Sequence, residues 1–107
     1  EDPLPDADPQ ALARLQTACP FPLALDATVA RTDPRDPLPA RRQVLKPTVL
    51  GGPRRTLEHA ARPGMACVVT STLETAVGLW HAAHLAAAVA ARSGATLAHG
   101  LDTAHWL

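Results

Sequence analysis

The fold of this chain is decided by residues 43–71, which read QVLKPTVLGGPRRTLEHAARPGMACVVTS. An apolar run over residues 43–45 ends on a lysine, and a Gly-Gly-Pro turn then leads into a predicted helix over residues 54–62. A Pro-Gly pair closes that helix, and a β-branched run over residues 66–69 follows it. This order of strand, helix and strand predicts a βαβ unit with two parallel strands.

The same pattern recurs on both sides of this unit. Helices are predicted over residues 8–18 and 74–92, and the short apolar runs at residues 23–25 and 96–98 are predicted to be strands. Residues 28–42 are rich in Pro, Asp and Arg, which indicates a surface connection. Strand ends are therefore expected near positions 1, 26, 46, 70 and 99.

Repeated βα units predict an α/β fold with a parallel sheet. Four to five units amount to about half of an eight-stranded (β/α) barrel. We therefore expect residues 1–107 to form the C-terminal portion of a barrel domain, from about the fourth or fifth strand to the eighth. The chain opens on Glu1-Asp2-Pro3 rather than on methionine, so we also expect it to continue a longer protein.

Composition narrows the classes of partner. Ten basic and ten acidic residues give a net charge of zero, so nothing steers the chain toward nucleic acid or a membrane surface. No apolar run approaches the ~18 residues that cross a bilayer. The two cysteines, Cys19 and Cys67, show no disulfide pattern, which favours a reducing compartment. We expect a cytoplasmic protein with neither a nucleic acid nor a membrane partner.

Lys46 is the single lysine among the ten basic residues. An ammonium group can lose its proton near neutral pH when it is desolvated, whereas a guanidinium group cannot. Lys46 also stands at the end of an apolar run, and it is therefore our leading candidate for chemistry. The alternative is a lysine retained by chance at the end of a strand.

Acidic residues stand at the ends of two neighbouring strands, on the face where β/α barrels build their active sites. Glu1 and Asp26 would converge there, and carboxylate oxygens are the ligands that Mg²⁺ prefers. A metal at this position stabilises the charge that forms when a proton leaves a carbon next to a carboxylate. Lys46 would face the same pocket as a base or as a cation. Taken separately, Glu1 is typical of a turn and Asp26 of a helix cap. Their spacing with Lys46, one βα unit apart, favours an active site.

Seven segments of the chain form a series that goes beyond these single residues. In order, they are Glu1-Asp2-Pro3, Leu23-Ala24-Leu25-Asp26, Val44-Leu45-Lys46-Pro47-Thr48, Gly51-Gly52, Thr70-Ser71-Thr72-Leu73-Glu74-Thr75, Gly78-Leu79 and Gly100-Leu101-Asp102-Thr103. This series resembles the C-terminal half of the o-succinylbenzoate synthases, a family of the enolase superfamily. The Lys-Pro-Thr, Ser-x-x-Glu and Gly-Leu-Asp-Thr elements are the most specific to that family.

The resemblance implies an enolase-superfamily barrel and a carbon–oxygen lyase of menaquinone biosynthesis. In that reaction a cyclohexadiene carboxylate loses water and becomes the aromatic o-succinylbenzoate. The implied cofactor is Mg²⁺, which Mn²⁺ can replace, and the implied partner is a small carboxylate substrate. By the resemblance, Glu1 and Asp26 are metal ligands and Lys46 is catalytic. The implied substrate contacts are Thr70, Ser71, Gly100 and Leu101.

The chain departs from the family pattern in two ways. The third metal acid, a second catalytic lysine, the first half of the barrel and the N-terminal capping domain would all precede Glu1. The missing N-terminal half of the same protein is therefore an expected partner, and we expect these 107 residues alone to be inactive. The family also has Glu after the fifth-strand Asp, where this chain has Ala27, and that Glu can pair with a nearby lysine.

Several alternatives stay open at this point. A racemase, a dipeptide epimerase or a cycloisomerase places acids and lysines on the same strands of the same scaffold. A truncated, inactive product and a Schiff-base enzyme built on Lys46 are further readings. His81 and His84 have helical spacing but no third ligand nearby, which favours a helix surface. His99 lies close enough to the predicted site to be a candidate substrate contact.

Overall fold

The computed structural model describes residues 1–4, 8–103 and 105, and within them one parallel sheet has the strand order β1-β2-β3. The strands are β1 (Ala24–Leu25), β2 (Arg42–Leu45) and β3 (Ala66–Val69). Leu25 pairs with Gln43, and Leu45 pairs with Val69. The strands predicted over residues 23–25, 43–45 and 66–69 are confirmed.

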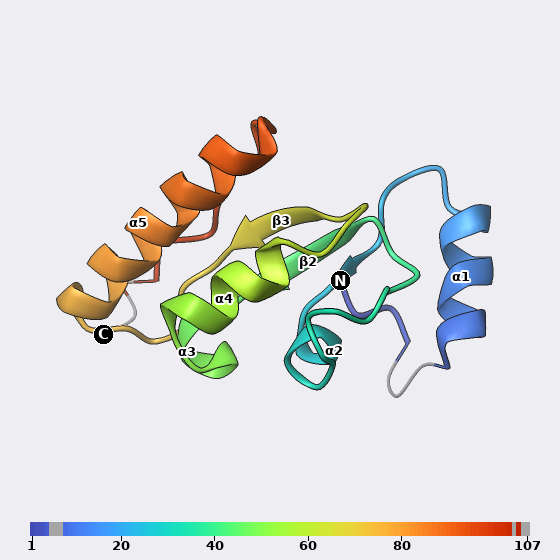
Figure 1. The fold of residues 1–107 in the computed structure, drawn as a ribbon, viewed down its shortest axis with the longest axis horizontal. Coiled ribbons are helices and arrows are strands. Elements are labelled where there is room, and N and C mark those ends of the chain that lie inside the picture. The colour runs from blue at the N-terminus through green and yellow to red at the C-terminus, as the bar shows by residue number, and fades with distance from the viewer. Residues whose placement is uncertain (5–7, 104, 106–107) are drawn as a thin grey trace.

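Helices connect and flank these strands (Figure 1). Their bounds are α1 (Pro9–Ala18), α2 (Ala27–Ala30), α3 (Pro47–Leu50), α4 (Pro53–Ala60) and α5 (Ala76–Ser93). The helices predicted over residues 8–18, 54–62 and 74–92 are confirmed as α1, α4 and α5. The connection over residues 28–42 contains most of the short helix α2, and α3 was not predicted.

The ends of the two longest helices follow from their sequences. At the start of α1 the Asp8 carboxylate accepts a hydrogen bond from the Gln10 amide (2.7 Å), and Pro9 occupies the first turn. At the end of α5, Gly94 adopts a left-handed conformation with φ of 63°, which glycine tolerates without steric cost. Local capping rules are therefore enough to set these ends.

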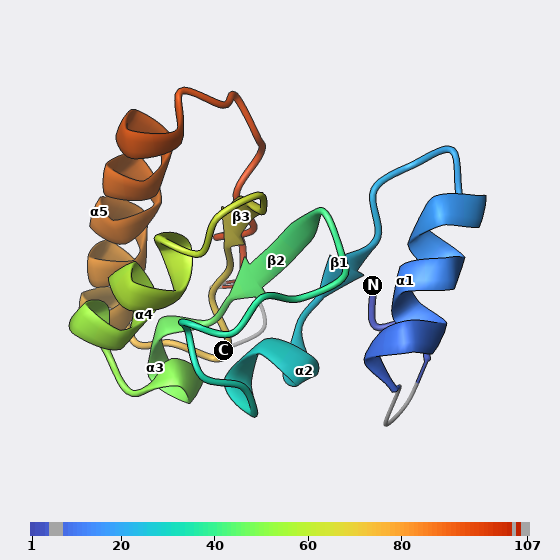
Figure 2. The ribbon, with the colours of Figure 1, turned by 45° about the vertical axis from the view of Figure 1, so that its right-hand side comes forward.

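The order of the strands limits the possible architectures. Parallel neighbours that follow one another in sequence need crossover connections, and right-handed crossovers place all of these connections on one face of the sheet. In Figures 1 and 2, α1 lies beside β1 and α5 beside β3, at opposite ends of the sheet. The chain is thus an α/β protein whose parallel sheet is compatible with part of a barrel.

The core cluster combines buried side chains of the three strands with those of α1, α2 and α5, and residues of α4 pack against it. In β3, Cys67 and Val69 are buried while Ala66 and Val68 are only half-buried, so the strand buries one face more completely than the other. The most deeply buried apolar side chains are those of Leu25, Val29, Leu45 and Val69. Cys67 is a core residue, and burial raises the pKa of its thiol.

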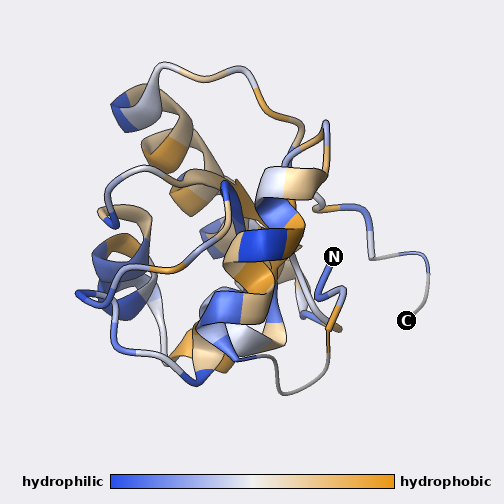
Figure 3. Cartoon of the chain, turned by 90° about the vertical axis from the view of Figure 1, so that its right-hand side faces the viewer, coloured by the Kyte–Doolittle hydropathy of each residue, from blue (hydrophilic) through white to orange (hydrophobic). Residues whose placement is uncertain are grey.

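Helix α1 contributes Leu12 to the core cluster and is also fixed by one buried polar side chain, Gln16. Gln16 is buried beside Leu12, its Nε2 donates to the Phe21 carbonyl (3.1 Å) and its Oε1 accepts from the Leu23 amide (2.8 Å). Figure 3 shows both hydrophilic and hydrophobic residues on α1, as expected for a helix that buries one side.

The strand predicted over residues 96–98 is wrong for the described chain, because only an isolated parallel bridge between Thr70 and Gly100 forms there. The hydrogen bond of the Val69 amide explains why no regular strand pairs with β3 here. That amide donates to Nδ1 of the His99 ring (3.0 Å) instead of to a backbone carbonyl, so the ladder is interrupted. The Gly100 amide still donates to the Val69 carbonyl (3.0 Å), and this covers the edge of β3.

Among the described residues, no helix is both long and apolar enough to cross a membrane.

Candidate active site at the carboxyl ends of the strands

Two charged side chains meet at the carboxyl ends of β1 and β2. Asp26 directly follows β1 and Lys46 directly follows β2, and parallel strands end at the same edge of a sheet. Lys46 Nζ forms an ion pair with Asp26 Oδ2, and the two side chains are 30% and 15% exposed respectively. Because both are partly buried, solvent and salt screen this pair less than an exposed one.

Glu1 joins the same cluster. Its carboxyl group lies within hydrogen-bonding reach of Asp26, and burial, this hydrogen bond and the charge of Asp26 all raise the pKa of Glu1. The charge of Lys46 acts in the opposite direction. The structure therefore brings together three predicted site residues that are far apart in the sequence.

Asp2, which sequence reasoning did not single out, fixes the geometry of this cluster. Its carboxylate accepts hydrogen bonds from the amides of Asp26 (3.2 Å) and Ala27 (2.8 Å) and from the Thr28 hydroxyl (3.2 Å). The Asp2 amide in turn donates to the Ala24 carbonyl (2.9 Å). These bonds hold Glu1 against the end of β1, although a φ of 40° at Asp2 is uncommon for any residue but glycine.

The donor set of this cluster fits a hard divalent cation. Two carboxyl groups that share a hydrogen bond need a proton or a cation between them, because two adjacent negative charges repel each other. Mg²⁺ binds through one or two carboxylates and keeps several waters. Glu1 and Asp26 supply two such groups, and no group of three or more His, Cys, Asp or Glu side chains suited to a metal occurs in the described residues.

The predicted substrate contacts lie next to this cluster. Thr70 follows Val69 as Lys46 follows Leu45, and these last residues of β3 and β2 are paired, so Lys46 and Thr70 are neighbours on the same face. The Thr70 hydroxyl is buried and has no hydrogen-bond partner among the described residues. It is therefore a polar group that a ligand could satisfy.

Ser71, Gly100 and Leu101 have structural contacts of their own. The Ser71 hydroxyl meets the Gly100 carbonyl (3.2 Å) and the Thr103 hydroxyl (2.8 Å), so its hydrogen-bonding capacity is largely used. At Gly100 an added Cβ would lie 3.0 Å from Cγ2 of Thr70, and Leu101 packs against the core. The structure thus brings the four predicted contacts together. Of their side chains, the Thr70 hydroxyl is the one without a hydrogen-bond partner among the described residues.

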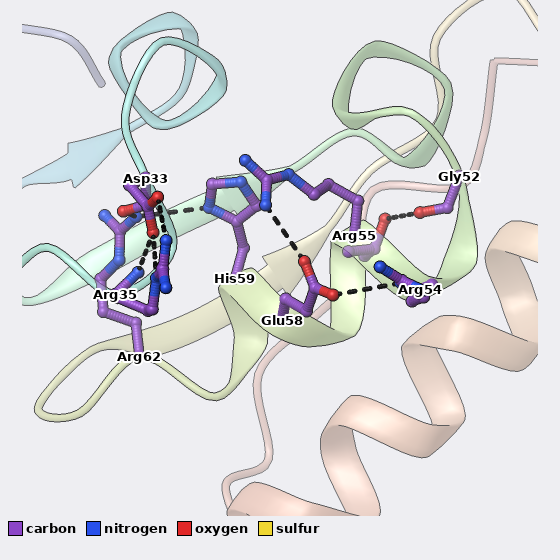
Figure 4. Close-up of polar contacts among 9 residues, drawn as sticks. Asp33, Arg35, Gly52, Arg54, Arg55, Glu58, His59 and Arg62 are labelled. Atoms are coloured by element: carbon purple, nitrogen blue, oxygen red, sulfur yellow. Dashed lines mark hydrogen bonds and ion pairs between the residues drawn. The ribbon is translucent and has the colours of Figure 1, made fainter.

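A second polar cluster lies around α4, away from the strand ends (Figure 4). Asp33 holds Arg35 through two hydrogen bonds (3.0 and 2.9 Å), which is the main cause of the strongly lowered pKa of Asp33. Glu58 contacts both Arg54 (3.3 Å) and Arg55 (3.1 Å), and these contacts lower its pKa. Arg54 is 94% exposed, so its side chain is solvated.

Two histidines of the chain have local structural partners, and a third lies on a helix surface. His84 Nδ1 lies 2.8 Å from the Trp80 carbonyl and its ring packs edge-on against Trp80, while His81 is exposed, which agrees with a helix surface. His99 uses Nδ1 to accept from the Val69 amide, so its ring completes a sheet edge. Its Nε2 is buried without a partner among the described residues.

The fold and site define an α/β protein with an acid–lysine cluster at the carboxyl edge of a parallel sheet. No protein-family model matches the sequence, and no curated protein matches it. The likeness to the o-succinylbenzoate synthases therefore rests on the seven segments of the sequence alone.

Proposed function

We propose that this chain supplies part of the active site of a Mg²⁺-dependent o-succinylbenzoate synthase, a carbon–oxygen lyase of the enolase superfamily. The observation that supports this most is the convergence of Glu1, Asp26 and Lys46 at one sheet edge. A parallel sheet with the strands in sequence order is compatible with such a barrel.

In this proposal Glu1 and Asp26 hold the metal together with a third acid from the N-terminal half of the same protein. Bound Mg²⁺, or Mn²⁺ in its place, would stabilise the negative charge that develops on the substrate carboxylate. Water is lost when a C–H bond next to that carboxylate and a C–O bond on the neighbouring carbon both break. Thr70 would supply a hydrogen bond to the substrate, and the protein would act in the cytoplasm.

Lys46 contributes a positive charge and three donors on the face of the substrate that the strand ends line. In the family a Glu after the fifth-strand Asp can pair with a lysine, whereas Ala27 here offers only its amide to Asp2. Lys46 pairs with Asp26 directly instead. Asp26 would therefore both bind the metal and orient Lys46.

The test begins with the coding DNA upstream of Glu1. We expect an in-frame segment with a lysine at one strand end and an aspartate at the next, and the protein encoded by both halves should dehydrate the cyclohexadiene carboxylate only when Mg²⁺ is present. Asp26→Asn should lower kcat/KM by at least about 100-fold, because a charged oxygen ligand is lost.

Glu58→Gln is the matched control, since it also removes a carboxylate from an ion pair but lies around α4. It should leave the rate unchanged. Dehydration that does not need Mg²⁺, or an Asp26→Asn variant as fast as the wild type, would contradict the proposal. Turnover of N-succinylamino acids or dipeptides without any dehydration would instead identify a racemase or an epimerase on the same scaffold.

A further inference from the structure

A pocket of about 250 Å³ lies between the start of α4 and the first half of α5, and its lining contains none of Glu1, Asp26 and Lys46, the strand-end cluster. Its walls are largely apolar and include Pro47, Pro53, Ala82 and Leu85, whereas Glu74 and His81 are the ionisable residues that line it. Concave, mostly apolar pockets with few polar groups are typical of small-molecule sites.

The Glu74 carboxylate is held rigidly at this pocket. Its Oε1 accepts hydrogen bonds from the hydroxyls of Thr72 (2.7 Å) and Thr48 (2.9 Å) and from the Thr72 amide (3.3 Å). These bonds lower the pKa of Glu74, so the group is ionised at neutral pH. Its Oε2 accepts no hydrogen bond from any residue that the structure describes.

Gly78 explains how this oxygen keeps its position. A Cβ built on Gly78 would lie 2.8 Å from Glu74 Oε2, closer than real Cβ contacts. Glycine is unfavourable in a helix relative to alanine, so its place in the first turn of α5 calls for a reason. The absent side chain leaves room for the carboxylate at the wall of the pocket.

From this arrangement we propose that the pocket binds a small organic ammonium ion with an apolar body. The ammonium group would donate to Glu74 Oε2, and the hydrocarbon part would lie among Pro53, Ala82 and Leu85. A charged donor is favoured over a neutral one because hydrogen bonds between ionised partners are stronger. An apolar cavity of ~150 Å³ accepts benzene, so one ring with a short amine fits the larger volume here.

The probe for this site is benzylammonium, with benzyl alcohol as its neutral isostere. Titration of the ¹⁵N-labelled 107-residue chain with benzylammonium should shift the amide signals of Gly78, His81, Ala82 and Leu85. Benzyl alcohol should bind about 10-fold more weakly or worse, a difference of ~1.4 kcal/mol. Equal affinity for the two probes would overturn the proposal.

Two variants make the role of Glu74 testable. Glu74→Gln keeps the shape of the side chain and should reduce benzylammonium affinity about 10-fold, to the level of the alcohol. Gly78→Ala displaces the carboxylate but raises helix propensity, so it should fold and should lose the same selectivity. Unchanged preference for the charged probe in either folded variant would refute the site. This outcome is independent of the proposed lyase activity.

Discussion

The strand-end cluster and the α4 cluster contain similar charged groups but differ in how those groups are assembled. Asp26 and Lys46 are 20 residues apart, and Asp2 reaches residues 24 to 26 positions away. Around α4, by contrast, Asp33 pairs with Arg35 two residues on, and Glu58 pairs with arginines three and four residues before it. Ion pairs between residues a few positions apart need only the local helix or loop. The strand-end cluster, by contrast, forms only when the strands pair in the sheet.

Exposure separates the two regions as well. At the strand ends Lys46 and Asp26 are 30% and 15% exposed, while Arg35 and Arg54 in the α4 cluster are 88% and 94% exposed. Exposed ion pairs contribute little to stability because water and salt screen them. Long sequence separation together with partial burial is therefore what distinguishes a candidate site from surface pairing in this chain.

The largest expected effect comes from replacing Lys46, the residue just after β2, by arginine. If the protein is the proposed lyase and Lys46 transfers a proton in it, Lys46→Arg should lower kcat by roughly 10²–10⁴-fold, the range for loss of such a group. Arg42→Lys, on the same strand face, is the control and should leave kcat unchanged. Near-normal turnover by Lys46→Arg would leave Lys46 only a charge role.

The second effect concerns Arg62, the buried exception in the α4 region, which is 3% exposed. Its Nη2 donates to the Asp33 carbonyl (2.9 Å) and to the Thr32 hydroxyl (3.3 Å), while its Nε and Nη1 have no partner among the described residues. Arg62→Ala should lower the free energy of unfolding by about 1–3 kcal/mol, because buried acceptors lose their donor.

Arg62→Met should cost less than Arg62→Ala in urea denaturation, because it fills the same space and removes the two unpaired nitrogens, Nε and Nη1. If Arg62→Met is the more destabilising of the two, the unpaired groups must have a partner in solution. Arg62 would then belong to a polar network organised by tertiary structure, and the α4 region would resemble the strand-end cluster in this respect.

A smaller effect is the pH dependence of folding stability that His59 causes. This side chain is buried beside Arg62. Burial first, and then the charges of Arg62 and Arg55, lower its pKa below the ordinary 6.5. The unfolded chain therefore binds a proton before the folded chain does, so stability is full above pH 6.5 and falls as the pH drops from 6.5 toward the lower folded pKa.

The measurement is the urea denaturation midpoint as a function of pH in the wild type, in His59→Gln and in His84→Gln. His59→Gln should remove this loss, and His84→Gln, at an exposed helix position, should retain it. Carboxylates with lowered pKa such as Glu58 lose their contribution only below 4.5, so a loss of stability that begins at pH 6.5 is assigned to His59 and not to them. Identical profiles in wild type and His59→Gln would show that another group titrates.

The smallest effect is expected for the exposed arginines. Arg54→Ala and Arg35→Ala should leave the urea midpoint unchanged at moderate salt, because their partners remain solvated when the pair is lost. A clear loss of stability in either variant would mean that the α4 cluster is organised by tertiary structure, as the strand-end cluster is.

Local signals in the sequence account for much of the fold. The Asp8-Pro9 cap, the Gly-Gly-Pro turn, Gly94 and the apolar run of β3 each act within a few residues, and each predicted an element that is present. The convergence of Asp26 and Lys46 was also predictable, because parallel strands end at the same edge.

What sequence reasoning missed depends on contacts between distant residues. Asp2 binds the turn after β1, Gln16 joins α1 to β1, and the His99 ring replaces a backbone acceptor. In each case a polar side chain satisfies a backbone group that no pattern of hydrophobicity marks. The Ser-x-x-Glu segment was noted as a family element, but the Glu74 pocket appears only once α4 and α5 are packed together.

The most direct test of the account is to ask where a divalent cation binds. Paramagnetic Mn²⁺ broadens nearby amide signals, so we would titrate it at millimolar concentration into the ¹⁵N-labelled 107-residue chain. We predict broadening confined to the amides of Asp2, Asp26, Ala27 and Lys46, even if binding by two carboxylates alone is weak. Broadening centred on Asp33 and Glu58, or no selective broadening at all, would contradict the claim that the strand ends form the metal site.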